Sequence, residues 1–172
     1  MTDTTTRMTR LKVLAIISSL VFASLLGSSM AILTQPTTAY AQQSQTFTAK
    51  LTGKDEVPPV NTQATGIAQF QQSPDGKEIN YDLTATNLQG FMMAHIHQGK
   101  AGENGQPVAP LSMGKGKITS SDLKGPLAGK QISDLVDLMK NGGAYVNIHT
   151  QQNQNGEIRG QIMSGTSSGG SQ

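Results

Sequence analysis

From Gln45 onward, apolar and polar residues alternate in short runs separated by glycine, proline and asparagine. Alternation with a period of two is typical of β-strands that bury one face, and frequent turn residues indicate many short strands. The pattern therefore predicts an all-β domain with an antiparallel sandwich or barrel. The expected strands are 46–52, 65–72, 78–87, 91–97, 115–119, 144–149 and 157–163.

One segment departs from this alternation and has the periodicity of a helix. Its apolar residues follow the spacing i, i+3, i+4, i+7, which places them on one face of a helix. Ser133 is the expected N-cap, and Gly142 follows the expected end. We predict a short amphipathic helix over 133–140, packed over one end of the sheet. The apolar residues are Ile132, Leu135, Val136 and Met139.

The N-terminus has the features of an export signal. Three basic residues precede an uncharged apolar stretch over 13–33, and Ala39-Tyr40-Ala41 has the small-x-small form of a signal-peptidase site. We expect residues 1–41 to be a cleaved signal peptide. The apolar stretch is also long enough for an uncleaved N-terminal anchor. In both cases we expect a secreted or cell-surface domain over 45–163, followed by a disordered Ser/Gly tail over 164–172.

Charge and composition exclude several classes of partner. Without residues 1–41 the chain has ten basic and ten acidic residues, so nothing favours nucleic acid or an anionic membrane as a partner. Membrane contact is therefore expected only through the N-terminal segment. The chain has no cysteine, which excludes disulfides, thiolate ligands and a thiol nucleophile.

The chain has three histidines, and all of them lie in predicted strands. His95 and His97 share one face of their strand because side chains two residues apart point the same way. His149 lies on the corresponding non-core face of a later strand. Imidazole is a ligand for both copper and zinc. We therefore consider a mononuclear metal site of His95, His97 and His149, with Glu157 or water completing the shell.

A structural role for the same histidines is the alternative. The segment 98–105 is a glycine-containing loop whose backbone groups need hydrogen-bond partners, and His97 or His149 can supply them. His-x-His on a strand is by itself a weak motif. Met93, on the same face, is a conceivable soft ligand for Cu(I), but we expect it to serve in core or edge packing.

Other polar groups give no catalytic constellation. We expect Lys54-Asp55-Glu56 to belong to a proline-stiffened structural bend, and Glu157 and Arg159 to form a solvated ion pair. There is no Gly-x-Ser-x-Gly elbow and no phosphate-binding glycine loop. The sequence therefore favours a non-enzymatic protein.

Several motifs in order resemble the CHRD domain, named for chordin and also found in exported single-domain microbial proteins. These are the segments 51–60, 64–66, 94–97 with the following glycine loop, 145–150 and 155–162. The chain differs at Gln154, where the family usually has proline, and at Gln98-Gly99, which replaces a glycine-proline pair.

The resemblance implies an extracellular, all-β domain of immunoglobulin-like type. We therefore expect an antiparallel Greek-key β-sandwich with one short helix. In chordin such domains belong to a protein that binds growth factors. This favours a non-catalytic binding module for an extracellular protein or envelope component. A three-histidine copper or zinc site is the alternative function.

Overall fold

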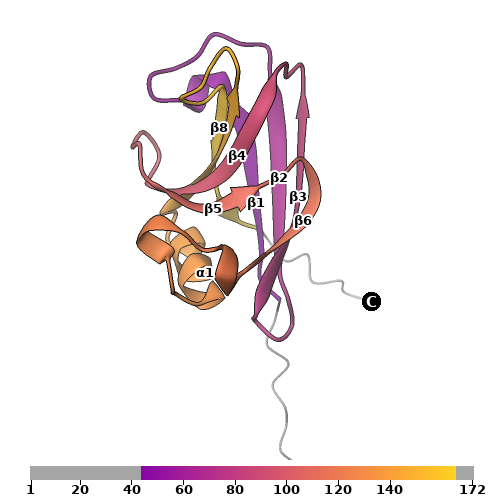
Figure 1. Ribbon diagram of the computed structural model, residues 1–172, viewed down its shortest axis with the longest axis vertical. Helices are drawn as coiled ribbons and strands as arrows, with labels where there is room; N and C mark the ends of the chain where they lie inside the picture. The colour runs from indigo at the N-terminus through magenta and orange to yellow at the C-terminus, as the bar shows by residue number, and fades with distance from the viewer. Residues whose placement is uncertain (1–43, 166–172) are drawn as a thin grey trace, which may run out of the picture. The chain divides into compact units, whose positions relative to one another are not determined.

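Residues 44–165 are described by a computed structural model, in which nine strands form one antiparallel sheet (Figure 1). Their order in the sheet is β5-β4-β7-β8-β1-β2-β3-β6, and β9 pairs with β1. The expected signal peptide and most of the expected tail lie outside the described residues. The strands are β1 Thr46–Thr52, β2 Thr65–Gln72, β3 Glu78–Thr86, β4 Phe91–Gln98, β5 Pro107–Leu111, β6 Gly114–Thr119, β7 Ala144–Thr150, β8 Ile158–Gln161 and β9 Met163–Ser164.

The sheet curls back on itself and is nearly a barrel. The strands at the two ends of its order, β5 and β6, are consecutive in the chain. The prediction of an all-β antiparallel fold with one helix is confirmed. All described strands join in one sheet, so a Greek-key sandwich of immunoglobulin type stays a prediction.

The core lies inside this curled sheet, because alternate side chains of each strand point inward. In β1, Phe47, Ala49 and Leu51 are buried, while Lys50 between them is exposed. The alternation of apolar and polar residues in the sequence thus correctly predicts which side chains of the strand face the core and which face outward. Further buried core side chains are Ala68, Phe70, Ile79, Leu83, Ala94, Ile96, Ile118, Val146, Ile148, Ile158 and Ile162.

Two expectations about the strands were wrong in part. Strand β5 lies in a stretch from which no strand was predicted, and it pairs with β4 from Ala94↔Leu111 to His97↔Pro107. The expected strand over 157–163 is divided into β8 and β9. The strand β9 includes Ser164, which was expected to belong to the tail.

The predicted helix is present as α1, Ile132–Lys140, and it contacts β7 and β9. Its four predicted apolar residues are all buried. The cap differs from the prediction: the N-cap is Gln131, whose backbone N–H donates to Asp134 Oδ2 at 2.8 Å. Three short 3₁₀ helices are Gly53–Asp55, Ser120–Asp122 and Gly125–Leu127.

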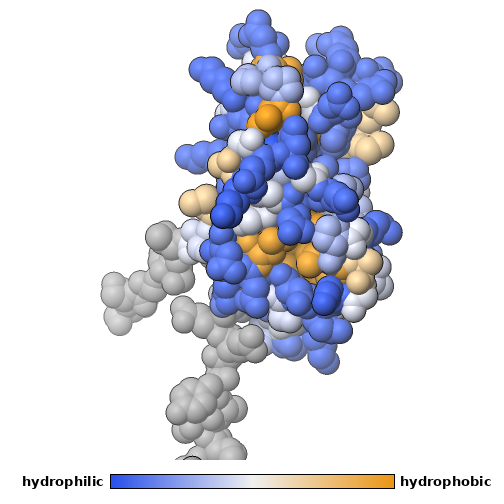
Figure 2. Space-filling view, turned by 90° about the vertical axis from the view of Figure 1, so that its left-hand side faces the viewer, coloured by the Kyte–Doolittle hydropathy of each residue, from blue (hydrophilic) through white to orange (hydrophobic). Residues whose placement is uncertain are grey.

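The outer surface is mainly polar. On the face shown in Figure 2, hydrophilic residues predominate, and an apolar area lies at about the height of α1 and β5. Among the helices of residues 44–165, none has the length and hydropathy required to cross a bilayer.

Candidate metal centre

The three histidines lie on the outer face of two neighbouring strands. Strands β4 and β7 are paired, with Met93 opposite His149, His95 opposite Asn147 and His97 opposite Tyr145. The intervening Ala94 and Ile148 are buried in the core and are also opposite each other. The sequence therefore predicted the face correctly, and the pairing of β4 with β7 brings His149 to the other two.

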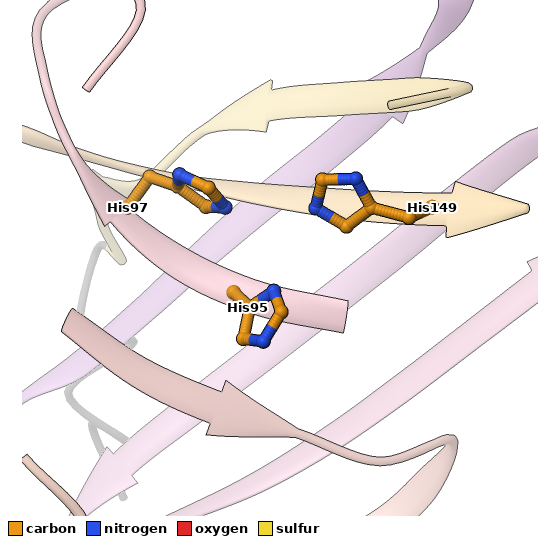
Figure 3. Close-up of side chains that lie close together, drawn as sticks. All are labelled: His95, His97 and His149. Atoms are coloured by element: carbon orange, nitrogen blue, oxygen red, sulfur yellow. The ribbon is translucent and has the colours of Figure 1, made fainter. Parts of the chain in front are cut away.

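The imidazole rings converge on one small volume. One ring nitrogen from each of His95, His97 and His149 lies within 4.8 Å of the corresponding nitrogens of the other two. The ring centroids are 5.7 Å apart for His95 and His97, 5.5 Å for His95 and His149, and 5.8 Å for His97 and His149. Figure 3 shows the rings of His97 and His149 facing each other from their two strands, with His95 beside them.

Hydrogen bonds determine which nitrogens are free. His97 Nδ1 lies 2.9 Å from the carbonyl oxygen of Gly105, and His149 Nδ1 lies 2.9 Å from that of Gln154. A carbonyl oxygen only accepts, so Nδ1 carries the proton in both rings and Nε2 keeps its lone pair. Both Nε2 atoms are buried and have no hydrogen-bond partner in residues 44–165, and the same is true of Nδ1 of His95.

This arrangement is compatible with both roles considered for the histidines. The structural role is real, because His97 and His149 hold loop carbonyls through Nδ1. It uses only one nitrogen of each ring. In metal sites a ligating histidine commonly donates its second N–H to a carbonyl, which orients the ring and fixes its tautomer. The loop contacts are thus of the kind that supports metal ligation.

A loop over residues 99–106 covers this side of the sheet and is attached at several points. Tyr145 Oη accepts a hydrogen bond from the backbone N–H of Gly105 at 3.1 Å. Arg159 donates to the carbonyl of Lys100 at 3.0 Å and to Asn104 Oδ1 at 3.2 Å. These contacts hold the Gly105 carbonyl in place for His97.

Arg159 is buried, so the expectation that it forms a solvated ion pair with Glu157 was wrong. Its side chain is 1 % exposed, and its guanidinium carbon lies 3.4 Å from the centroid of the Tyr145 ring. The Tyr145 ring in turn stacks on His97, with centroids 5.1 Å apart and planes 18° apart. The sequence showed the face of Arg159 but not the loop that covers it.

Burial favours the neutral form of two of these histidines, His95 and His97. It lowers the pKa of His97 to about 4, and the backbone hydrogen bond to Gly105 only partly offsets this effect. Burial also lowers the pKa of His95, with a further contribution from the charge of His149. A neutral imidazole is the form that binds a metal ion. At neutral pH both rings are therefore in the ligating state.

Glu157 is not part of the histidine cluster in the structure. Its carboxylate accepts hydrogen bonds from Thr150 Oγ1 at 2.6 Å and from Thr62 Oγ1 at 2.7 Å. Burial acts to raise the pKa of Glu157, but these hydrogen bonds outweigh it and hold the pKa below its ordinary value. The cluster in residues 44–165 thus offers three protein ligands, and the expected fourth carboxylate holds the β7–β8 turn instead.

Glu56 lies in a buried environment that the sequence does not indicate. Its side chain is 5 % exposed, and Oε2 lies 3.5 Å from Nδ2 of Asn147. Burial raises the pKa of Glu56 to about 7, although the nearby charge of Arg159 opposes the shift. Oε1 of Glu56 and Oδ1 of Asn147 are both buried and have no hydrogen-bond partner in the part of the chain that the structure describes. No local pattern in the sequence distinguishes Glu56 from its exposed neighbours Lys54 and Asp55.

The sequence comparison identifies the family. The model of the CHRD domain matches residues 47–162, which is most of the chain. The chain belongs to the CHRD family. The match begins in β1 and ends after β8, so all the histidines lie within the CHRD domain. No curated protein and no solved structure matches this CHRD chain.

Proposed function

We propose that this CHRD domain binds a single transition-metal ion through His95, His97 and His149. The supporting observation is the convergence of three imidazoles, each of which has a buried ring nitrogen without a hydrogen-bond partner in residues 44–165. A buried polar atom without a partner carries a free-energy cost of about 1–3 kcal/mol, and a metal ion would remove this cost at three atoms. Copper and zinc are the ions that this donor set fits.

The spacing is compatible with such an ion after a small movement. Ligand nitrogens around a tetrahedral zinc ion are roughly 3.4 Å apart, given metal–nitrogen bonds of about 2.0–2.1 Å. The three nitrogens of the cluster lie within 4.8 Å of one another. The most distant pair must therefore approach by at most about 1.4 Å, which small side-chain rotations provide. Water then completes a four-coordinate shell.

The first experiment is metal titration of the full-length chain with Cu(II) and Zn(II), in competition with a chelator of known affinity. The test variants are His97→Asn and His149→Asn. Asparagine keeps an N–H donor near the position of Nδ1, so the bonds to Gly105 and Gln154 can be retained while the Nε2 ligand is lost. Each variant should bind about 100-fold more weakly, a loss of about 2.7 kcal/mol.

Asn80→Ala is the control. Asn80 is exposed on β3, which pairs with neither β4 nor β7, so the substitution leaves the three imidazoles and their loop contacts in place. Its metal affinity should remain near that of the parent. The proposal fails if the parent binds no metal stoichiometrically, or if the asparagine variants bind as tightly as the parent.

A non-catalytic binding module for an extracellular protein or envelope component is the second candidate. Phe91, Met92 and Met93 are consecutive and 40–45 % exposed. Adjacent exposed apolar residues commonly mark interaction surfaces. Binding of the purified chain to isolated envelope fractions should decrease in Phe91→Ser if this surface takes part. Equal binding by the parent and the variant would exclude this surface.

We further propose that the domain acts outside the cytoplasm, as the N-terminal sequence indicates. The supporting features are the basic and apolar leader and the Ala39-Tyr40-Ala41 motif. Mass spectrometry of the protein from the native host tests this proposal. A mature N-terminus at Gln42 is expected for a cleaved leader, and an intact N-terminus in the membrane fraction indicates an anchor. An intact chain confined to the soluble cytoplasmic fraction would contradict export.

A further inference from the structure

The outer edge of the histidine cluster carries an exposed thioether. Met93 is the cross-strand partner of His149 and lies two residues before His95 on the same face of β4. Directly opposed residues in an antiparallel pair have Cβ atoms about 4.5–5.5 Å apart. The methionine side chain is flexible and long enough to span this separation, so its sulfur can approach the imidazole of His149.

Packing does not explain this methionine. Its side chain is 45 % exposed, and it is not among the residues of the hydrophobic core in the described part of the chain. The neighbouring Ala94, by contrast, is 1 % exposed and faces the core. An exposed methionine opposite His149 and two residues before His95 can bring a soft sulfur donor to a site that has only nitrogen donors.

We propose that the ion bound by the histidine cluster is copper, held as Cu(I) by the three imidazoles together with Met93. Thioether sulfur favours Cu(I) and contributes little to the binding of zinc, which prefers nitrogen, oxygen or thiolate ligands. Met93 therefore acts as the selectivity-determining ligand of the site. This proposal rests on the three-histidine site proposed above and adds the identity of the metal and a fourth ligand.

The test compares Cu(I) and Zn(II) affinities of the full-length parent with those of Met93→Leu. Leucine keeps an apolar side chain of similar volume and removes only the sulfur. Chelator competition under anaerobic conditions should show Cu(I) affinity about tenfold lower in Met93→Leu and Zn(II) affinity changed less than about twofold. X-ray absorption of the Cu(I) form should show a copper–sulfur shell in the parent that is absent from the variant.

Met92→Leu is the matched control. Met92 is adjacent on the same strand and is 44 % exposed, but none of the histidines is paired with it. It should leave both affinities and the copper–sulfur shell unchanged. Equal Cu(I) affinity in the parent and Met93→Leu would overturn the proposal, and so would an equal loss of Cu(I) and Zn(II) binding. A parent that binds neither ion would instead refute the metal site itself.

Discussion

At the scale of single residues, Glu56 has the carboxyl group in residues 44–165 whose pKa is shifted most strongly. It is buried beside Asn147, and one of its oxygens has no hydrogen-bond partner. Burial raises its pKa to about 7, so between about pH 4.5 and 7 the folded state holds a proton that the unfolded chain releases. A side chain of the same shape but without charge would fit this position at any pH.

Glu56→Gln is therefore expected to stabilise the domain above pH 7. A carboxyl with a raised folded-state pKa contributes stability that is fully present below its unfolded pKa of 4.5 and is lost as the pH rises through about 7. The free energy of unfolding of the variant should exceed that of the parent by on the order of 2–3 kcal/mol at pH 8 and by almost nothing at pH 4.5. Urea unfolding across this range tests the prediction, and a gain of equal size at both pH values would contradict it.

Metal binding should resist acid more than a site of ordinary histidines does. Protons compete with a metal for imidazole, and two side chains with pKa near 6.5 would together weaken binding roughly 100-fold on going from pH 7 to 5.5. The pKa of His97 is about 4, and that of His95 is also lowered, mainly by burial. Chelator competition at both pH values should show a much smaller decline. A decline approaching 1000-fold would mean that all three rings titrate normally.

At the scale of elements, the N-terminus of α1 depends on one carboxylate. Asp134 accepts a hydrogen bond from the backbone N–H of Gln131 and completes a capping box. Asp134→Ala should therefore lower the free energy of unfolding by about 1 kcal/mol. Asp137→Ala is the control, because Asp137 makes only a surface ion pair with Lys140 at 3.8 Å. Equal losses in the two variants, measured by urea unfolding, would contradict a specific role for the cap.

The elements were predictable where hydrophobic periodicity is strong, as in β1 and β2, whose bounds match the prediction at both ends. Strand β5 was missed for a physical reason. It contains Pro107 and Pro110, which have no backbone N–H, and it follows a glycine-containing loop. Proline is tolerated in edge strands, and among the described strands β5 pairs only with β4. An edge strand with two prolines has the local composition of a loop.

The candidate site was predictable only in part, for a related reason. Alternation placed His95, His97 and His149 on outer faces, but only long-range pairing decides that β4 and β7 are neighbours. The burial of Glu56 and Arg159 depends on two loops that meet where Asn104 Nδ2 donates to the carbonyl of Val57 at 2.9 Å. Such a contact between residues 47 positions apart leaves no periodic signal in the sequence.

At the scale of the whole molecule, a bound metal should act as a clamp between β4 and β7. An ion that binds the folded chain and not the unfolded chain stabilises it by about 2.7 kcal/mol when its free concentration is 100 times Kd. The unfolding temperature of the full-length chain should therefore rise when copper is added. Added copper should leave the unfolding temperatures of His97→Asn and His149→Asn nearly unchanged. An equal upward shift in all three proteins would indicate nonspecific binding.

The pairing of β9 with β1 also has a consequence for how this domain can be joined to others. The backbone N–H of Gly165 donates to the carbonyl of Thr46 at 2.8 Å, so the described part of the domain, residues 44–165, has its two ends side by side. The row His95, Asn147, Arg159 and Thr52 runs across the other end of β1, about 20 Å away along the strand. A domain with adjacent ends can be inserted into a surface loop of another protein without moving the two sides of that loop apart. Its histidine cluster would then project away from the host.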